Sequence, residues 1–243
     1  MTTPGVTTRR VLCGLTALVV AALLAACASG PAPPQWRLDA RGALDAFESA
    51  WMRGQSRVAA QEFARARSEL ASTGDARLVA QAELTRCALQ VASLEFDDCP
   101  GFGPLAHDAG PAARAYAAYL AADWQGLDVA LLPAPHRAVV AQHGAASVQD
   151  GAGSTRAAQG AALAAIEDPL SRLVAAGALF RTGRIAPAGI AEAVDTASAQ
   201  GWRRPLLSWL GVQEKRAQAA GDAQAAAAIR RRIELVLGVT AKR

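Results

Sequence analysis

Signals that begin and end helices recur along this chain at intervals of about twenty residues, and no stretch alternates in the manner of a β-strand. Glycine followed by aspartate at Gly74-Asp75 and Gly221-Asp222 is typical of a helix end beside a new N-cap, and Asp168-Pro169 is typical of a fresh start. The sequence therefore predicts an all-α fold of about nine or ten helices.

The expected helices are short and closely spaced. They cover residues 39–53, 56–73, 76–94, 111–124, 135–142, 154–167, 169–182, 187–200, 205–220 and 223–237. Ser56 is the expected N-cap of the second helix, and residues 96–110 and 144–153 are expected loops. Helices of this length joined by short turns pack as antiparallel neighbours, so we expect an array of αα-hairpins in a solenoid.

Two segments match part of a known helical repeat. Ala59, Phe63 and Ala66 have the spacing alanine, three residues, aromatic, two residues, alanine. The second match consists of Trp209, Ala225 and Ile229. Both segments resemble tetratricopeptide repeats, a resemblance that covers about a third of the mature chain and implies a solenoid of that type. The departures are Ala43, Val212-Gln213 and Arg232, which stand where the repeat has tryptophan, Leu-Gly and alanine.

The amino-terminal stretch has the layout of a secretory signal. Arg9-Arg10 precedes an apolar run from Val11 to Leu23, and small residues follow. The sixteen residues from Val11 to Ala26 are fewer than the roughly twenty that cross a bilayer. We therefore expect residues 1–26 to be a cleaved signal peptide.

The residues Leu24, Ala25, Ala26 and Cys27 resemble the bacterial lipobox. The resemblance implies cleavage before Cys27 and acylation of that cysteine with fatty chains such as palmitate, which would anchor the protein to a membrane. The alternative is an uncleaved signal anchor in which Cys27 is an ordinary thiol. No aspartate follows Cys27, and by the same resemblance we expect an outer-membrane lipoprotein that faces the periplasm.

The remaining chain divides into a tether and a folded part. Residues 27–35 are rich in proline and are expected to be extended, and residues 36–243 form the expected α-helical repeat domain. Loss of the signal would lower the formal charge from +4 to about +2, because Arg9 and Arg10 leave with it. This small charge and the expected compartment argue against a nucleic acid partner, and we expect none.

Cys87 and Cys99 are the two cysteines that remain after the signal and the lipobox are set aside. An even pair in an oxidising compartment predicts a disulfide, which would hold residues 95–104 against the helix that carries Cys87. Two buried free thiols are the alternative. A redox-active pair is not expected, because no Cys-x-x-Cys motif is present.

No catalytic, metal or cofactor signature is found in the sequence. The histidines are His107, His136 and His143, and no carboxylate lies three or four residues from the last two, so we expect solvated or capping side chains. The richest polar cluster contains Glu95, Asp97, Asp98, Cys99, His107 and Asp108. It lacks a calcium-loop pattern, and we expect a solvated loop.

The aromatic residues are few, and most should lie in the core because alanine-rich helices bury little apolar area without them. The aromatic residues expected to line a concave groove are Tyr116, Tyr119, Trp124 and Trp202. Our first hypothesis is a membrane-anchored protein that binds an envelope protein or peptide as a scaffold or assembly factor, with no enzymatic activity. The alternatives are an envelope enzyme acting on peptidoglycan or glycan, and a structural spacer without a specific ligand.

Overall fold

The computed structural model describes residues 33–144 and 160–238, and every regular element in these residues is helical. The α-helices are α2 (Gln35–Met52), α3 (Ser56–Ala71), α4 (Ala76–Ala92), α5 (Pro111–Leu120), α6 (Ala134–Gly144), α8 (Pro169–Arg181), α9 (Pro187–Ala199), α10 (Arg203–Ala219) and α11 (Ala223–Leu237). Two short 3-10 helices, η1 (Gly103–Leu105) and η2 (Val129–Leu131), and a helical segment at 160–164 complete the set. The predicted all-α array is confirmed.

Several predicted features lie outside the described residues. They are the signal peptide with Leu24, Ala25, Ala26 and Cys27, most of the tether, and the loop at 145–153 with the start of the helix that follows it. No helix in residues 33–144 and 160–238 combines the length and the apolar character needed to cross a membrane.

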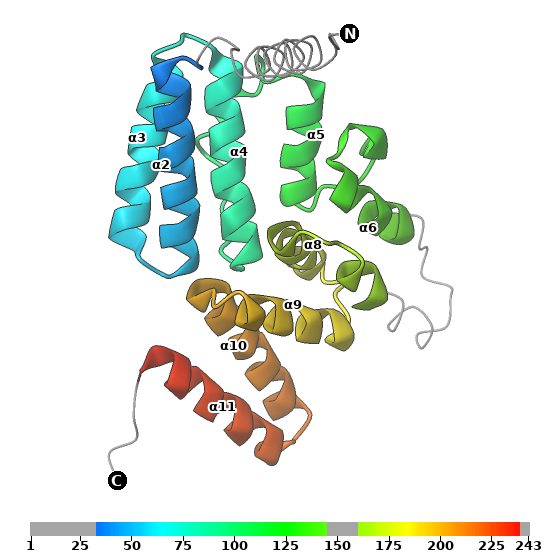
Figure 1. Cartoon of the computed structure of the whole chain (residues 1–243). Coiled ribbons are helices and arrows are strands. Elements are labelled where there is room, and N and C mark those ends of the chain that lie inside the picture. Colours follow the sequence, from blue (N-terminus) through cyan, green and yellow to red (C-terminus); the bar gives the residue numbers. More distant parts are fainter. Residues whose placement is uncertain (1–32, 145–159, 239–243) are drawn as a thin grey trace, which may run out of the picture.

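The helices form an array in which chain neighbours pack together (Figure 1). Helices α2 to α5 stand side by side, and α9 lies below α4 and α8 in this view, with the α10–α11 hairpin beyond it. Several contacts are not between chain neighbours: α8 packs on α4, α5 and α6, and α2 contacts both α4 and α10. These contacts close the array into one body with a shared core.

The helix boundaries follow the capping residues closely. The side chains of Asp75, Asp168 and Asp222 accept hydrogen bonds from backbone N–H groups of α4, α8 and α11, as expected for N-caps. Ser56 is not the predicted N-cap, because α3 already begins at that residue and its hydroxyl accepts a bond from Arg204. Helix α5 ends at Leu120 rather than 124, because Ala122 takes a left-handed conformation with φ of 64°.

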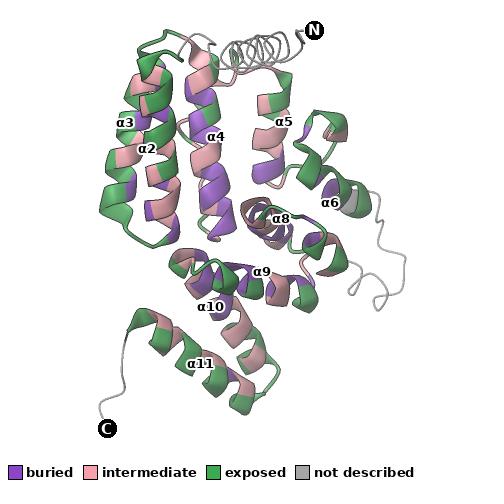
Figure 2. Cartoon of the chain, viewed as in Figure 1, coloured by how far each residue is buried: buried purple, intermediate pink, exposed green. Residues whose placement is uncertain are grey.

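The core is centred on α4 and α8, which carry more buried residues than the other helices (Figure 2). Every residue of α8 from Leu173 to Leu179 is buried. Gly177 lies directly against the backbone carbonyl of Val91 in α4, and a Cβ at this position would collide with that oxygen. The absence of a side chain at Gly177 therefore lets the two central helices cross closely.

Helix α11 contributes less to the core than its sequence suggests. Ile229 and Ile233 are half-buried, and Leu237 is 46% exposed. Leu235 is 80% exposed. Among the described residues α11 packs mainly on α10, so its opposite face is left uncovered there.

The carboxyl end of α4 is joined to α2 and to α10 by tryptophan side chains. The indole N–H of Trp51 in α2 donates to the Leu89 carbonyl and the Ser93 hydroxyl, both at 3.2 Å. The indole N–H of Trp209 in α10 donates to the Ala92 carbonyl at 3.1 Å. The Leu89 carbonyl also accepts from the backbone N–H of Ser93 at 3.2 Å. The Ala92 carbonyl lies in the last turn, where the helix supplies no partner, so the Trp209 indole satisfies a buried group that would otherwise be unpaired.

We expect Trp209→Phe to lower the free energy of unfolding by about 1–3 kcal/mol, because it leaves the buried Ala92 carbonyl without a donor. Urea denaturation followed by circular dichroism measures this. The matched control is Trp36→Phe, since the indole N–H of Trp36 has no hydrogen-bond partner within the described residues. Equal losses in the two variants would show that the hydrogen bond contributes nothing beyond ring size.

Candidate binding site

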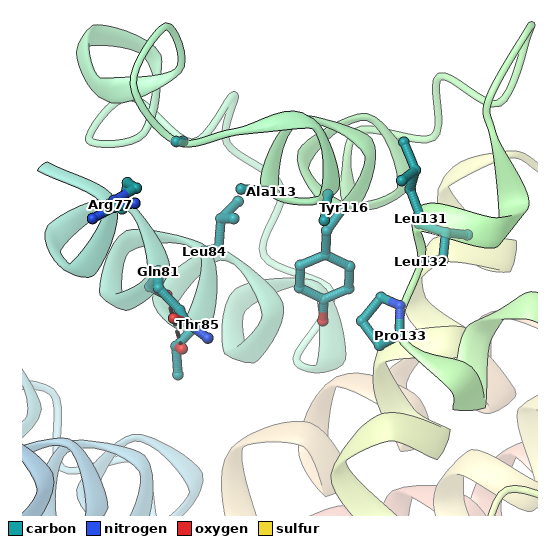
Figure 3. Close-up of a pocket in the computed structure, with 11 residues that line it drawn as sticks. Arg77, Gln81, Leu84, Thr85, Ala113, Tyr116, Leu131, Leu132 and Pro133 are labelled. Carbon is teal, nitrogen blue, oxygen red and sulfur yellow. Dashed lines mark hydrogen bonds between the residues drawn. The ribbon is translucent and has the colours of Figure 1, made fainter.

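A pocket of about 490 Å³ lies between α4, α5 and the segment from Leu131 to Pro133 (Figure 3). It is lined by Arg77, Gln81, Leu84, Thr85, Ala109, Ala112, Ala113, Tyr116, Leu131, Leu132 and Pro133. The lining is mainly apolar. A volume of this order is typical of sites that take a small ligand or the side chains of a peptide.

The local sequence explains why the pocket is open. Gln81, Leu84 and Thr85 lie on one face of α4, because residues three and four apart are neighbours on a helix. The facing surface of α5 presents Ala112 and Ala113, whose methyl groups are too small to fill the space opposite. Two adjacent helices therefore leave a hollow where larger residues would have met.

The pocket combines an apolar interior with a row of polar groups along α4. Arg77 is held by Asp75 through bonds of 2.9 and 3.0 Å, and the Thr85 hydroxyl donates to the Gln81 carbonyl at 3.0 Å. The side-chain amide of Gln81 lies at the same rim, as Figure 3 shows. The site can thus accept an apolar group while hydrogen-bonding a polar backbone that passes over it.

Tyr116 is the one predicted groove aromatic that lines this pocket. Its ring lies between α4 and Pro133 in Figure 3, and it stacks on His136 with ring centres 5.7 Å apart. Burial raises the pKa of the Tyr116 hydroxyl, and the nearby Asp168 carboxylate raises it further. The hydroxyl is therefore a neutral hydrogen-bond donor at any physiological pH.

The other predicted groove aromatics occupy different places. Tyr119 is fully buried and so lies in the core, which corrects the expectation that it lines a groove. Trp124 stacks on Tyr119 at 5.6 Å and lines a separate pocket with Asp123 and Thr182. Trp202 is the N-cap residue of α10 and is half-buried against the core. The spacing of these aromatic residues along the sequence does not distinguish these environments.

His136 also lies in a different environment from the one predicted from the sequence. It was expected to be solvated or to cap a helix, but it is only 2% exposed, and its Nδ1 lies 3.2 Å from the Tyr119 hydroxyl. Burial lowers the pKa of His136 to about 4, although Asp168 acts in the opposite direction. His136 is therefore a neutral partner of Tyr119 that braces the wall behind Tyr116. The side chain of His143 lies outside the described residues.

The acidic loop after α4 is largely exposed to solvent, as expected, and it is also attached to the helices by ion pairs. Its carboxylates pair with arginines as follows: Glu95 with Arg204 at 2.6 Å, Asp97 with Arg86 at 3.5 Å, and Asp98 with Arg181 at 3.2 Å. Glu95, Asp98, His107 and Asp108 are exposed, whereas Asp97 and Cys99 are half-buried. The three carboxylates of this loop thus attach it to α4, α8 and α10.

Cys87 and Cys99 form a disulfide-capable pair, with Cα atoms 5.7 Å apart. Asp97 brings a carboxylate oxygen within 4.8 Å of both sulfur atoms. These are three donors of the kind that bind metals, but Asp97 already pairs with Arg86 and accepts a 2.8 Å bond from Gln90. The arrangement therefore fits a covalent link between α4 and the loop better than a metal centre.

No family model, no curated protein and no solved structure matches this chain. The function is therefore argued from the geometry of the described residues. The α4–α5 pocket and three others formed by those residues hold no pair of converging carboxylates, the arrangement that would favour glycan hydrolysis.

If the Cys87–Cys99 disulfide forms, dithiothreitol should lower the free energy of unfolding by up to about 3 kcal/mol, because reduction frees the loop in the unfolded chain. Urea midpoints with and without the reductant measure the loss. The Cys87→Ala/Cys99→Ala double variant should show no response to the reductant. An unchanged midpoint in the native chain would mean that the thiols are free.

We expect stability to fall as the pH drops from about 6.5 towards 4, because unfolded His136 binds a proton in this range while the folded form, with its pKa near 4, does not. The shift corresponds to about 3 kcal/mol and is fully present as a stability loss below pH 4. Urea denaturation at pH 7, 5.5 and 4.5 measures the slope. His136→Gln should have a flatter profile than the native chain, and parallel profiles would contradict this assignment.

Proposed function

We propose that this protein binds a protein or peptide partner of the bacterial envelope through the α4–α5 pocket, as a membrane-anchored scaffold or assembly factor. The observation that carries the proposal is the open, mainly apolar pocket with Tyr116 at one side and the polar row of α4 at the other. An extended or helical peptide places apolar side chains in such a hollow and its polar groups at the rim.

The rigidity of the pocket walls supports this use. Tyr116 is backed by His136 and Tyr119, and the Tyr119 and His136 rings are 4.8 Å apart in a buried cluster. The Trp124 indole N–H donates to the Tyr119 carbonyl at 3.0 Å, which fixes the turn after α5. A preformed site loses little conformational entropy when it is occupied, and this favours affinity.

Exposed apolar groups beside the pocket enlarge the surface that a partner would cover. Leu131 in η2 lines the pocket and is 36% exposed. Ala112 on α5 is exposed at the opposite side. Buried apolar area at the centre of an interface, surrounded by polar groups, is the arrangement in which a few residues supply most of the binding energy.

The proposed location rests on the amino-terminal sequence. Leu24, Ala25, Ala26 and Cys27 support an acylated anchor in the outer membrane, and residues 27–35 support a short tether to the domain that faces the periplasm. Helix α2 begins at Gln35, so the proposed tether leads directly into the array. A tethered binding domain would search for its partner close to the membrane surface.

In-cell crosslinking of the membrane fraction, followed by isolation of the tagged chain, tests the proposal. We expect one envelope protein to be captured at high yield by the native chain, and capture to fall at least about tenfold in Ala112→Trp, whose indole would cover the pocket. The matched control is Ala60→Trp, on an exposed position of α3 away from the pocket, which should capture as the native chain does.

The Cys27→Ser form separates specific binding from proximity. It should be released from the membrane and still bind the captured protein when the two are mixed in solution. Equal capture by the native chain and Ala112→Trp would overturn the assignment to this pocket. Capture of no specific protein would favour the spacer, and the enzyme alternative would then be tested with cell-wall fragments.

A further inference from the structure

A second pocket, of about 470 Å³, lies between α8, α9 and the last turns of α10, on a different part of the array from the α4–α5 pocket. Its floor is apolar and consists of Phe180, Ile185 and Ile190. The side formed by α10 carries the apolar Val212 next to two cations, Lys215 and Arg216. We name it the α9–α10 pocket.

The pocket forms where the chain turns from α8 into α9 and meets the side of α10. Its lining comes from the end of α8, the start of α9 and the second half of α10. Val212, Lys215 and Arg216 lie on the same face of α10, because their spacings of three and four residues place them side by side. That face lies beside the turn at Gly183, a residue with φ of 71° that also lines the pocket.

The two cations of this pocket are not neutralised. Lys215 and Arg216 are exposed, and neither forms an ion pair within residues 33–144 and 160–238. No carboxylate lines the pocket. The adjacent Glu214 is already paired with Arg230 at 2.9 Å. The dipole of α10 favours cations near its carboxyl end, which accounts for the positions of these two side chains. The dipole does not account for the apolar floor beside them.

We propose that the α9–α10 pocket binds a single-chain anionic amphiphile, namely a free fatty acid. The carboxylate would pair with Lys215 and Arg216, and the aliphatic chain would cover Phe180, Ile185 and Ile190. The pocket therefore favours a ligand that has both a charge and an aliphatic chain. An uncharged apolar compound would leave the two cations without an ion pair, and an anion without a chain would leave the apolar floor exposed to water. This site does not depend on the proposed partner binding at α4–α5.

Isothermal titration calorimetry tests the proposal. The ligands are sodium octanoate, decanoate and dodecanoate, each below its micelle concentration. The protein is the full chain carrying Cys27→Ser, which removes the predicted acylation. We expect one site per chain, with affinity rising about fourfold for each methylene until the pocket is filled. Dodecanol, which lacks the charge, should bind at least about tenfold more weakly than dodecanoate.

Variants assign the binding to this pocket. Lys215→Glu/Arg216→Glu should weaken dodecanoate binding at least about tenfold and leave dodecanol binding unchanged, because only the charge is reversed. The matched control is Arg231→Glu/Arg232→Glu, at exposed positions of α11 that do not line the pocket. Circular dichroism confirms that each variant is folded.

Three results would overturn the proposal: no saturable binding of any fatty acid, equal affinity for dodecanoate and dodecanol, or equal weakening by the α10 and α11 variants. The Ala112→Trp variant of the α4–α5 pocket should bind dodecanoate as the native chain does. Loss of partner capture in that variant with retained fatty acid binding distinguishes the two sites, so that either proposal can fail alone.

Discussion

The structure depends on the pairing of the carboxyl end of α4 with two tryptophan side chains. Trp51 reaches it from α2, and Trp209 reaches it from α10, 117 residues further along the chain than the carbonyl it binds. Backbone carbonyls at a buried helix end cost free energy unless they accept hydrogen bonds. Because the donors come from opposite parts of the chain, this single helix end joins the first three helices to the last ones.

The loop after α4 strengthens the same junction through charge. Arg204 lies over the Trp51 ring with its guanidinium carbon 4.1 Å from the ring centre, and it also pairs with Glu95. Arg181 lies over Phe96 and pairs with Asp98. Planar guanidinium groups can stack and hydrogen-bond at once, which a lysine cannot do as well. The loop thus bridges α8 and α10, and the helices around it hold both pockets in place.

The candidate sites could be predicted from the sequence only in part. Tyr116 was among the expected groove aromatics and does line a pocket, whereas Tyr119, three residues later on the same helix, is fully buried. Helical spacing indicates which residues share a face but not which helix covers that face. His136 shows the same limit, because its burial depends on Tyr119, 17 residues earlier. The α9–α10 pocket was missed for a related reason, since its lining comes from three helices whose meeting is a tertiary contact.

The sequence by itself determined the local structure of the described chain: its helical class, the approximate number of helices, and starts such as those capped by Asp75, Asp168 and Asp222. These features follow from interactions within a few residues of each other, which a sequence displays directly. Only the tertiary structure decided that α8 crosses α4 at Gly177, which polar groups are buried, and where pockets remain. Those outcomes depend on contacts between residues far apart in the chain, and local patterns carry no information about which distant surfaces meet.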